Sequence, residues 1–543
     1  MKFPSPNPAV AERYYTEAYW RSDSTSQLFE SMVQHHPERT ALSDAEGNLF
    51  TYRELHSHVE SVAAYFSNSD IGEEDIVTIC APNWWQTVVC ILATLRIGAI
   101  INPVPMTYGW KDIKYVVDTC QSKAVILAGK FRNTDHTAHI EDILGPGHGV
   151  KIVIQLEEGA RQAGVLFDTL LGKGECAVPL PAKPDNVAAI LFTSGTESKP
   201  KGVVHTHNTI LYGERCFVET LGLNHEDTCF MASPISHASG FLHGVILTLT
   251  TGGQLSILDV FTASAAVDQM LRDAATWTMG ATPFLVETAN ELRARNATLP
   301  ALRYFLCGGA PVPESVVRHA MDIGIQVLSV YGSTESPPHT IVWPSDPPEN
   351  AWTTDGRAAG DGIEIRIVDE NGNECRDGEI GEEWSRGPNT FLGYLNAPDV
   401  TAKSLDADGW YHSGDLAYKR PDGSIRISGR IKDMIVRGGQ NIAAREVEEL
   451  LIQIPGCIEC ALVGIPHDRL GETGGAVLVM EAGRKVGVQE VYDLLVTQGV
   501  AKFKIPERVE CWDELPKTPS GKIQKYKIQK MLAEDVQGGR IAE

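Results

Sequence analysis

The sequence has no apolar run long enough to cross a membrane as a helix. The two best candidates are interrupted, residues 87–101 by Arg96 and residues 240–258 by His243, and both fall short of the ~20 apolar residues that a span requires. Residues 1–20 have no apolar core of the signal-peptide kind, and the last residues carry no lipidation or peroxisomal signal. We therefore expect no membrane span and a cytoplasmic location.

Positive charge is scarce relative to negative charge. The 543 residues include 47 Lys and Arg against 70 Asp and Glu, which gives a net charge of -23. A surface this acidic repels nucleic-acid phosphates and anionic lipid, so nucleic acid is not an expected partner. The 43% hydrophobic and 22% charged content is that of a soluble globular protein, which excludes a disordered or collagen-like chain.

A second cysteine pair at zinc-finger spacing is missing. The 11 cysteines are scattered, and the C-x-x-C from Cys457 to Cys460 has no second pair at zinc-finger spacing. Free buried thiols in a reducing compartment are the expected state. For His205 and His207, helix-start or packing roles are favoured over metal binding.

Strand and helix patterns alternate in the first half of the chain. The expected order is strand, helix, strand, helix, strand, at residues 75–81, 84–97, 99–102, 111–120 and 124–128. Such units predict right-handed crossovers and a parallel sheet covered on both faces. The predicted fold class is α/β, with doubly wound mixed sheets in a large N-terminal domain.

The pattern changes twice towards the C-terminus. Short strands separated by Asp, Asn and Gly turns at residues 360–385 predict a small β subdomain. Beyond residue 432, a helical pattern places four apolar residues on one face: Val447, Leu450, Leu451 and Ile454. Strands at 460–465 and 475–480 and a helix at 488–496 complete a small α+β C-terminal domain.

One loop has the composition that a polyphosphate requires. Residues 192–202 follow the apolar run 187–191, and they combine small hydroxyl residues and glycines with two lysines. Such residues at a strand end expose N–H groups to an anion, and the lysines add positive charge. The loop is not the G-x-x-x-x-G-K-[ST] motif, and a flexible polar surface loop is the alternative.

Six further segments follow in order along the chain. They are 308–311 (GGAP), 331–335 (YGSTE), 409–415 (GWYHSGD), 428–433 (SGRIKD), 438–442 (GGQNI) and 516–523 (PKTPSGKI). The series resembles the adenylate-forming superfamily of acyl- and aryl-CoA synthetases, peptide-synthetase adenylation domains and luciferases, over nearly the whole chain. The resemblance implies an acid–thiol ligase that uses ATP, Mg²⁺ and coenzyme A.

The resemblance also implies which residues bind the nucleotide. In the ATP and AMP site it places Thr193, Ser194, Gly195, Thr196, Lys201, Gly308, Gly309, Ala310, Tyr331, Gly332, Ser333, Thr334, Asp415 and Arg430. Thr334 would donate to the α-phosphate, Asp415 would bind the ribose hydroxyls and Arg430 the ribose or phosphate. Glu335 would hold Mg²⁺ as a hard oxygen ligand. The phosphate loop departs from the family pattern at Glu197, which we expect to point away from the triphosphate or to contact another segment of the loop.

The C-terminal domain carries the other implied residues. Lys522 would reach the substrate carboxylate and the α-phosphate, neutralising charge as the acid attacks. Lys432 would be the hinge between a large domain, residues 1–431, and a small mobile domain, residues 432–543. The CoA-binding loop would contain Gly438, Gly439 and Gln440.

The acid substrate is indicated only by the expected acyl pocket. His237 would orient the acid or gate its tunnel, a packed loop histidine being the alternative, and Gly280, Ala281 and Cys307 would line the pocket. Small apolar residues and no acidic anchor favour an aryl or alicyclic acid, then a short-to-medium-chain fatty acid. A stand-alone adenylating enzyme that loads a carrier protein and an inactive nucleotide-binding regulator are the alternatives. The sequence indicates no oligomeric state.

Overall fold

The computed structural model of the chain describes residues 3–159, 161–180, 183–193, 200–309, 312–438, 440–467, 469–517 and 522–537. The chain forms two compact units, Met1–Glu364 with Ser385–Tyr411, and Ile365–Trp384 with His412–Glu543. Residues 412–431 thus group with the second unit, and the hinge boundary at residue 432 stays a prediction. No helix in the described ranges is both long and apolar enough to span a membrane.

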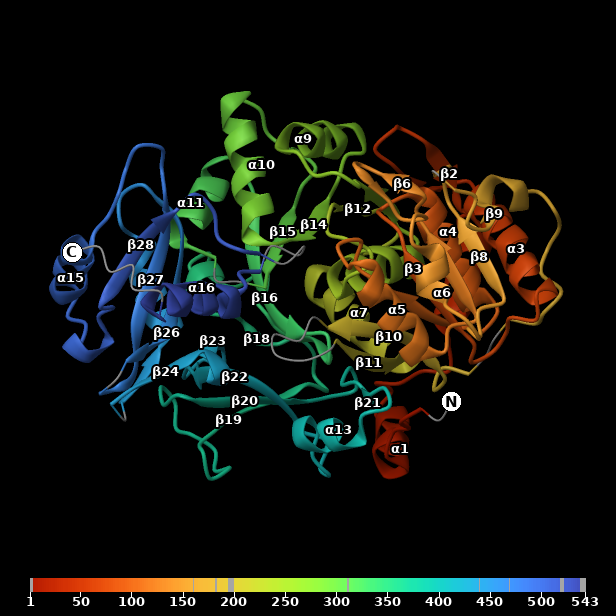
Figure 1. Cartoon of the computed structure of the whole chain (residues 1–543). Helices are drawn as coiled ribbons and strands as arrows, with labels where there is room; N and C mark the ends of the chain where they lie inside the picture. The colour runs from red at the N-terminus through yellow and green to blue at the C-terminus, as the bar shows by residue number, and fades with distance from the viewer. Residues whose placement is uncertain are drawn as a thin grey trace. The chain divides into compact units, whose positions relative to one another are not determined.

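The first unit contains a nine-stranded sheet. Its strands are β1 (Thr40–Ser43), β2 (Leu49–Thr51), β12 (Thr228–Met231), β13 (Gln254–Ile257), β14 (Trp277–Gly280), β15 (Tyr304–Gly308), β16 (Gln326–Ser333), β17 (Ser336–Ile341) and β18 (Arg357–Ala358). The order is β18-β17-β16-β15-β14-β12-β13-β1-β2, with parallel pairing from β16 to β1 and antiparallel edges. Figure 1 shows β14, β15 and β16 side by side.

An eight-stranded sheet forms the other half of this unit. Its strands are β3 (Ile76–Cys80), β4 (Ile100–Pro103), β5 (Ala124–Leu127), β8 (Ile152–Gln155), β9 (Val165–Leu166), β10 (Val187–Thr193), β11 (Lys201–Thr206) and β21 (Gly393–Tyr394), in the order β21-β11-β10-β4-β3-β5-β8-β9. A short ribbon joins β6 (Lys130–Phe131) to β7 (Thr134–Asp135). The predicted alternation of strands and helices is confirmed here, since β3, β4 and β5 pair in parallel.

The first unit also contains α-helices, several of which pack on the two sheets. They are α1 (Pro8–Thr16), α2 (Thr25–His35), α3 (Tyr52–Asn68), α4 (Trp85–Arg96), α5 (Trp110–Cys120), α6 (Ile140–Leu144), α7 (His207–Leu221), α8 (Leu247–Thr251), α9 (Ala263–Arg272), α10 (Thr282–Ala294), α11 (Glu314–Asp322), α12 (Asn350–Thr353) and α13 (Pro398–Ser404). Val117 of α5 is buried with Val125 of β5, and Val267 of α9 and Leu285 of α10 are buried with Phe305 of β15. Both sheets are therefore covered by apolar helix faces, which fixes the strand ends in place.

The second unit is built on two smaller sheets. The first contains β19 (Glu364–Val368), β20 (Gly381–Arg386), β22 (Tyr411–Lys419) and β23 (Ile425–Arg430) in that order, and the second contains β24 (Met434–Arg437), β25 (Gln440–Ala443), β26 (Cys457–His467), β27 (Gly471–Met480) and β28 (Arg508–Trp512). Its helices are α14 (Ala444–Leu451), α15 (Val488–Thr497) and α16 (Lys525–Gln537). Val447 and Leu451 of α14 are fully buried, as the helical pattern predicts.

Candidate active site

The carboxyl ends of neighbouring parallel strands bring the predicted substrate residues together. Gly280 ends β14 and pairs in register with Cys307 of β15, and Gly308 pairs in turn with Val330 of β16. Tyr331 follows Val330 on β16. Ligands of open α/β sheets bind outside the carboxyl ends of the strands, so this edge is the candidate site for the acyl group and the nucleotide base.

The turn after β15 requires glycine. A side chain on Gly308 would lie 2.7 Å from the carbonyl oxygen of Val330, and Gly309 has a φ of +86°. A β-carbon is therefore excluded at the first position and strained at the second. The turn leaves backbone exposed beside Tyr331, which suits a flat aromatic base.

His237 lies in a loop after β12 that is tied to this edge. The hydroxyl of Ser233 donates to the carbonyl of Met279 on β14 at 3.2 Å. Asn83, buried and absent from the sequence predictions, donates to the carbonyl of Ser233 and accepts the N–H of Ile235 at 2.9 Å. These bonds hold the loop at the strand ends.

The His237 ring is oriented by the start of a π-helical segment, Ser239–Ile246. Its Nδ1 lies 3.0 Å from the hydroxyl of Ser239 and 3.4 Å from the N–H of the same residue. Because a backbone N–H can only donate, Nδ1 accepts, and in the neutral ring Nε2 carries the proton. Nε2 is then the ring atom that can donate to a substrate oxygen.

Glu335 lies in a buried polar cluster. Its side chain is 8% exposed, and the hydroxyl of Tyr394 on β21 donates to its Oε1 at 2.8 Å. Burial and the neighbouring carboxylate raise the pKa of Tyr394, so the phenol stays a donor at neutral pH. Lys201 Nζ lies 5.2 Å from the centre of the Tyr394 ring, a cation–π contact.

These residues fit Mg²⁺ bound between one carboxylate and substrate phosphates. Mg²⁺ takes hard oxygen ligands and commonly uses one or two carboxylates together with phosphate oxygens. Glu335 offers such a carboxylate, oriented by Tyr394, and Lys201 adds positive charge beside the Tyr394 ring. Within the described ranges no group of three or more His, Cys, Asp or Glu side chains forms a complete metal cage.

His205 holds the main chain next to Glu335. Its Nε2 lies 2.7 Å from the carbonyl oxygen of Thr334, and its Nδ1 lies 3.0 Å from the hydroxyl of Thr209. The carbonyl can only accept, so Nε2 carries the proton and Nδ1 accepts from Thr209. Burial lowers the pKa of His205 to about 4, which keeps the ring neutral. His205 therefore positions Thr334 through its backbone, a role more specific than the predicted packing.

The second unit pairs two of the predicted ribose residues. Asp415 of β22 lies opposite Arg430 of β23 in the antiparallel register. Arg430 Nε contacts Asp415 Oδ1 at 2.6 Å, with Asp415 buried and Arg430 half-exposed. The guanidinium therefore orients the carboxylate that is expected to accept the ribose hydroxyls.

The predicted thiol loop is the tip of a tight hairpin. Arg437 of β24 pairs with Gln440 of β25, and the turn between them begins with Gly438, whose φ is +58°. A positive φ of this size favours glycine. The N–H of Gly438 donates to the carbonyl of Leu470 at 2.8 Å, which fixes the hairpin beside the turn that joins β26 to β27.

Models of known families match both parts of the chain. The model of the AMP-binding enzyme matches residues 29–395, and the model of the AMP-binding enzyme C-terminal domain matches residues 446–522. The chain belongs to the AMP-binding enzyme family.

Individual relatives of this AMP-binding enzyme cover nearly all of it. A medium-chain fatty-acid–CoA ligase from Escherichia coli is 37% identical over 95% of the chain and 92% of the relative. A ligase from Rhodococcus jostii that joins a bicyclic propanoic acid to CoA is 30% identical over 92% of the chain and 97% of the relative. The crystal structure of ATP-bound MatB from Rhodopseudomonas palustris has a TM-score of 0.85 at 27% identity. The match covers 94% of this chain and 99% of the MatB chain. The predicted acid–thiol ligase class, with ATP, Mg²⁺ and coenzyme A, and the predicted α/β fold are confirmed.

Several predicted residues lie outside the described part of this AMP-binding enzyme. They are Ser194, Gly195, Thr196, Glu197, Ala310 and Gly439. Thr193 and Lys201, which flank the phosphate loop, end β10 and begin β11, and these two residues pair in register. The loop therefore connects two adjacent antiparallel strands.

The smaller predictions on cysteine and histidine hold. Cys457 and Cys460 are free thiols, Cys460 buried and Cys457 half-buried. His207 is the first residue of α7, and its Nδ1 lies 3.0 Å from the hydroxyl of Thr25.

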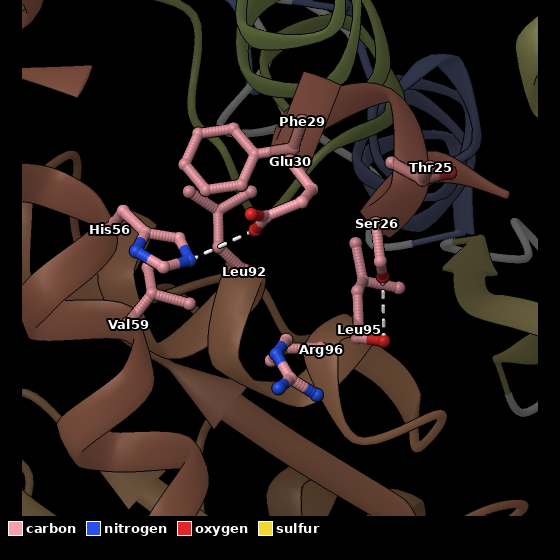
Figure 2. A pocket seen from close by; sticks show the side chains of 9 residues that line it. All are labelled: Thr25, Ser26, Phe29, Glu30, His56, Val59, Leu92, Leu95 and Arg96. Carbon is pink, nitrogen blue, oxygen red and sulfur yellow. Dashed lines mark hydrogen bonds and ion pairs between the residues drawn. The ribbon is translucent and has the colours of Figure 1, made fainter. Parts of the chain in front are cut away.

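A small cavity between α2, α3 and α4 is separate from this site. Its volume is about 10 Å³, room for about one water molecule. Figure 2 shows His56 and Glu30 facing each other across it, with an Nε2–Oε2 distance of 2.9 Å. None of the predicted site residues lines the cavity.

Replacing Tyr394 by phenylalanine is expected to weaken the magnesium-dependent step. The variant leaves the Glu335 carboxylate without its phenol donor, a loss of about 1.4 kcal/mol, or about tenfold in rate. When pyrophosphate release is measured against Mg²⁺ concentration, the variant should need more Mg²⁺ than the unmodified protein to reach half of its maximal rate. Tyr52→Phe, which removes a buried hydroxyl bond to the Gly253 carbonyl, is the matched control and should leave that requirement unchanged.

Folding stability is expected to fall in acid partly because of His207. Burial lowers its pKa from 6.5 to about 4, so between these pH values the unfolded chain binds a proton that the folded chain does not. A shift of this size removes about 3 kcal/mol as the pH falls through that window. Unfolding free energies of His207→Gln should decline less from pH 7 to pH 4.5 than those of the unmodified protein. If the unfolding free energy declined equally in both proteins, His207 would not be a source of the acid sensitivity.

Lys432→Pro tests the predicted hinge. Lys432 lies in a 3₁₀ turn, Ile431–Asp433, whose backbone angles are near those that proline imposes. We expect thioester formation to slow and acyl-adenylate formation to survive, because a fixed φ restricts rotation at this residue. Single-turnover rates of the two half-reactions check this, with the melting temperature as the control for folding. Equal rates of thioester formation in both proteins would exclude a hinge at Lys432.

Proposed function

We propose that this chain is an ATP-dependent carboxylic acid:CoA ligase that activates an apolar acid of medium size. A medium-chain fatty acid is the first choice, and an alicyclic or aryl acid is the second. This reverses the order favoured by the sequence alone. The observation that carries the choice is the 37% identity, over 95% of the chain, to a medium-chain fatty-acid–CoA ligase.

The first half-reaction joins the acid to AMP. A carboxylate oxygen of the substrate attacks the α-phosphorus of ATP, and pyrophosphate leaves. Negative charge builds on the α-phosphate as the bond forms, and donors already in place there lower the barrier. We assign this work to the Thr334 hydroxyl, with its backbone held by His205, and to the Lys522 ammonium. Glu335 would hold Mg²⁺, which would supply further positive charge for the phosphates.

The second half-reaction moves the acyl group to sulfur. The thiol of coenzyme A attacks the carbonyl carbon of the acyl-adenylate, the thiol proton is lost, and AMP leaves. We assign Asp415 and Arg430 to hold the nucleotide in both steps, and the hairpin at Gly438 to line the path of the thiol. We assign His237, whose Nδ1 accepts within its own loop, to donate from Nε2 to a carboxylate oxygen of the acid.

The residues expected to line the acyl pocket support an apolar acid. Gly280 and Cys307 are buried neighbours in the sheet, and Ala281 follows Gly280. Burial also raises the pKa of the Cys307 thiol to about 12, so it contributes no charge. An ammonium or a second carboxylate on the substrate would find no countercharge among these residues.

The test is a pyrophosphate-release screen with ATP and Mg²⁺. The acids are octanoic, cyclohexanecarboxylic, benzoic and palmitic acid, with phenylalanine as an amino acid. Coenzyme A and a phosphopantetheinyl carrier protein are offered as acceptors. We expect the highest kcat/KM with octanoic acid and thioester formation on coenzyme A.

Each other outcome contradicts part of the proposal. A preference for palmitic acid or phenylalanine would exclude the proposed substrate class. Thioester formation on the carrier protein alone would make the chain a stand-alone adenylating enzyme. Absence of pyrophosphate release with every acid would contradict ligase activity.

A further inference from the structure

The loop that carries Lys522 is closed at its base within the second unit. Lys517 and Ile523 form an antiparallel bridge, and the N–H of Gln524 donates to the carbonyl of Pro516 at 2.7 Å. Ile523 also packs against the apolar cluster formed by β26, β27 and α16. The main chain is therefore fixed directly after Lys522, whose own side chain is exposed.

Two ion pairs hold the ends of this loop. On the N-terminal side, Lys517 Nζ contacts the Glu459 carboxylate on β26. On the C-terminal side, Lys525 Nζ contacts Glu448 Oε1 of α14 at 2.8 Å. The two lysines bracket Lys522 in sequence, so each end of the loop is tied to a different element of the same unit.

The two carboxylates are shielded and are themselves fixed. Glu459 is 22% exposed and Glu448 is 17% exposed. Glu448 Oε1 also accepts the N–H of Leu462 on β26 at 2.5 Å. Ion pairs that are partly withdrawn from water interact more strongly than pairs on the open surface, which contribute little. These two pairs therefore differ from ordinary surface salt bridges.

We propose that Glu448 and Glu459 are positioning residues for acyl-adenylate formation, because they hold both ends of the loop that presents Lys522. The inference rests on the proposed function, in which Lys522 acts in the first half-reaction alone. Neither glutamate contacts the Gly438 hairpin in any bond found between described residues. Loss of either ion pair should therefore slow adenylation and spare thioester formation.

The test compares the two half-reactions in charge-neutral variants. Glu448→Gln, Glu459→Gln and the double variant are assayed for pyrophosphate release without coenzyme A. They are also assayed for transfer of a synthetic octanoyl-adenylate to coenzyme A. We expect adenylation to fall about tenfold in each single variant and about a hundredfold in the double variant, since misplacing a catalytic group by 1 Å costs about 100-fold. Transfer should be unchanged.

A matched control is available on the same helix. Glu446 of α14 contacts Lys504 Nζ at 2.6 Å, and neither residue adjoins the loop at 517–525. Glu446→Gln should leave adenylation at the level of the unmodified protein. Equal slowing by Glu446→Gln and Glu448→Gln would overturn the proposal, as would equal slowing of both half-reactions by the Glu448 or Glu459 variants.

Exchange of the charges provides a rescue. Glu459→Lys and Lys517→Glu should each slow adenylation, and combining them should restore most of the rate, because the ion pair re-forms with reversed sign. Hydrogen exchange at the Gln524 amide should be faster in Glu459→Gln than in the unmodified protein. The proposal would be overturned if the losses of adenylation rate in Glu459→Lys and Lys517→Glu simply added in the combined variant. Unchanged hydrogen exchange at the Gln524 amide in Glu459→Gln would overturn it as well.

The exchange measurement needs no substrate, so it separates this inference from the proposed function. An unmodified protein that releases no pyrophosphate with any acid would contradict the function, while the exchange result would still report on the loop. An active protein whose variants adenylate normally would contradict the positioning role alone.

Discussion

Lys522→Ala is expected to abolish acyl-adenylate formation and to leave transfer from a preformed acyl-adenylate to coenzyme A nearly intact. In the proposed first half-reaction, the ammonium would attract the attacking carboxylate and stabilise the negative charge that builds on the α-phosphate, and it would have no such role in the second. Removing one such electrostatic group costs about 100- to 1,000-fold in rate. Single-turnover pyrophosphate release and thioester formation from synthetic octanoyl-adenylate measure the two steps separately.

The geometry of the second unit explains why the two steps should separate. The Lys522 loop is tied to Glu459 at the start of β26, whereas the Gly438 hairpin is tied to Leu470, beyond the end of β26 at His467. The strand between Glu459 and His467 is about 26 Å long at about 3.3 Å per residue. The segment after the predicted hinge, residues 432–543, cannot bring both ends to the same atoms in one orientation, so we expect it to rotate between the steps.

A nearby lysine supplies the control for this variant. Lys527, exposed on α16, loses the same charge when replaced by alanine, and we expect both half-reactions to continue. If Lys522→Ala slowed both half-reactions equally, the alternation of two orientations would be wrong. Lys522 would then be a general electrostatic or structural residue.

Glu335→Gln is the second large effect we expect. The amide keeps the shape of the side chain and an oxygen that can accept from Tyr394, but it removes the negative charge that would hold Mg²⁺. Adenylation should fall about 100-fold or more, as for other residues that place charge at a phosphoryl group. Higher Mg²⁺ concentrations should recover part of the rate.

A buried carboxylate outside the metal site is the control. Glu214 of α7 is 2% exposed and contacts His243 Nδ1 at 3.0 Å. Glu214→Gln should lower stability without changing the Mg²⁺ requirement, because burial of an altered polar group affects folding rather than the metal. Normal turnover and normal Mg²⁺ dependence in Glu335→Gln would remove Glu335 from the metal site.

Helices and strands could be predicted where a short stretch of sequence contains the whole pattern of apolar residues. The strand, helix and strand at β3, α4 and β4 match the predicted ranges within two residues, since apolar run length and helical period are local properties. The helix α14 ends at Leu451, before the predicted Ile454. Pro455 disfavours helical backbone at Ile454, and Gly456 adopts a φ of +76°. Ile454 is buried nonetheless.

Contacts between distant segments could not be predicted in this way. Motif positions along the chain indicated Glu335, Asp415 and Arg430, but they gave no sign that Tyr394 contacts Glu335 or that His205 contacts Thr334. These pairs depend on strand order: β21 pairs with β11, which brings Tyr394 beside Val203. Only the assembled sheets create such contacts.

The most direct test of the proposed chemistry follows the oxygen atoms of the acid. Octanoic acid labelled with ¹⁸O in both carboxyl positions is incubated with the protein, ATP, Mg²⁺ and coenzyme A, and the products are analysed by mass spectrometry. We expect one ¹⁸O atom in AMP and one in octanoyl-CoA, because the carboxylate oxygen that attacks the α-phosphorus leaves with AMP. Label in inorganic phosphate together with ADP would show attack at the terminal phosphate and would contradict an acyl-adenylate.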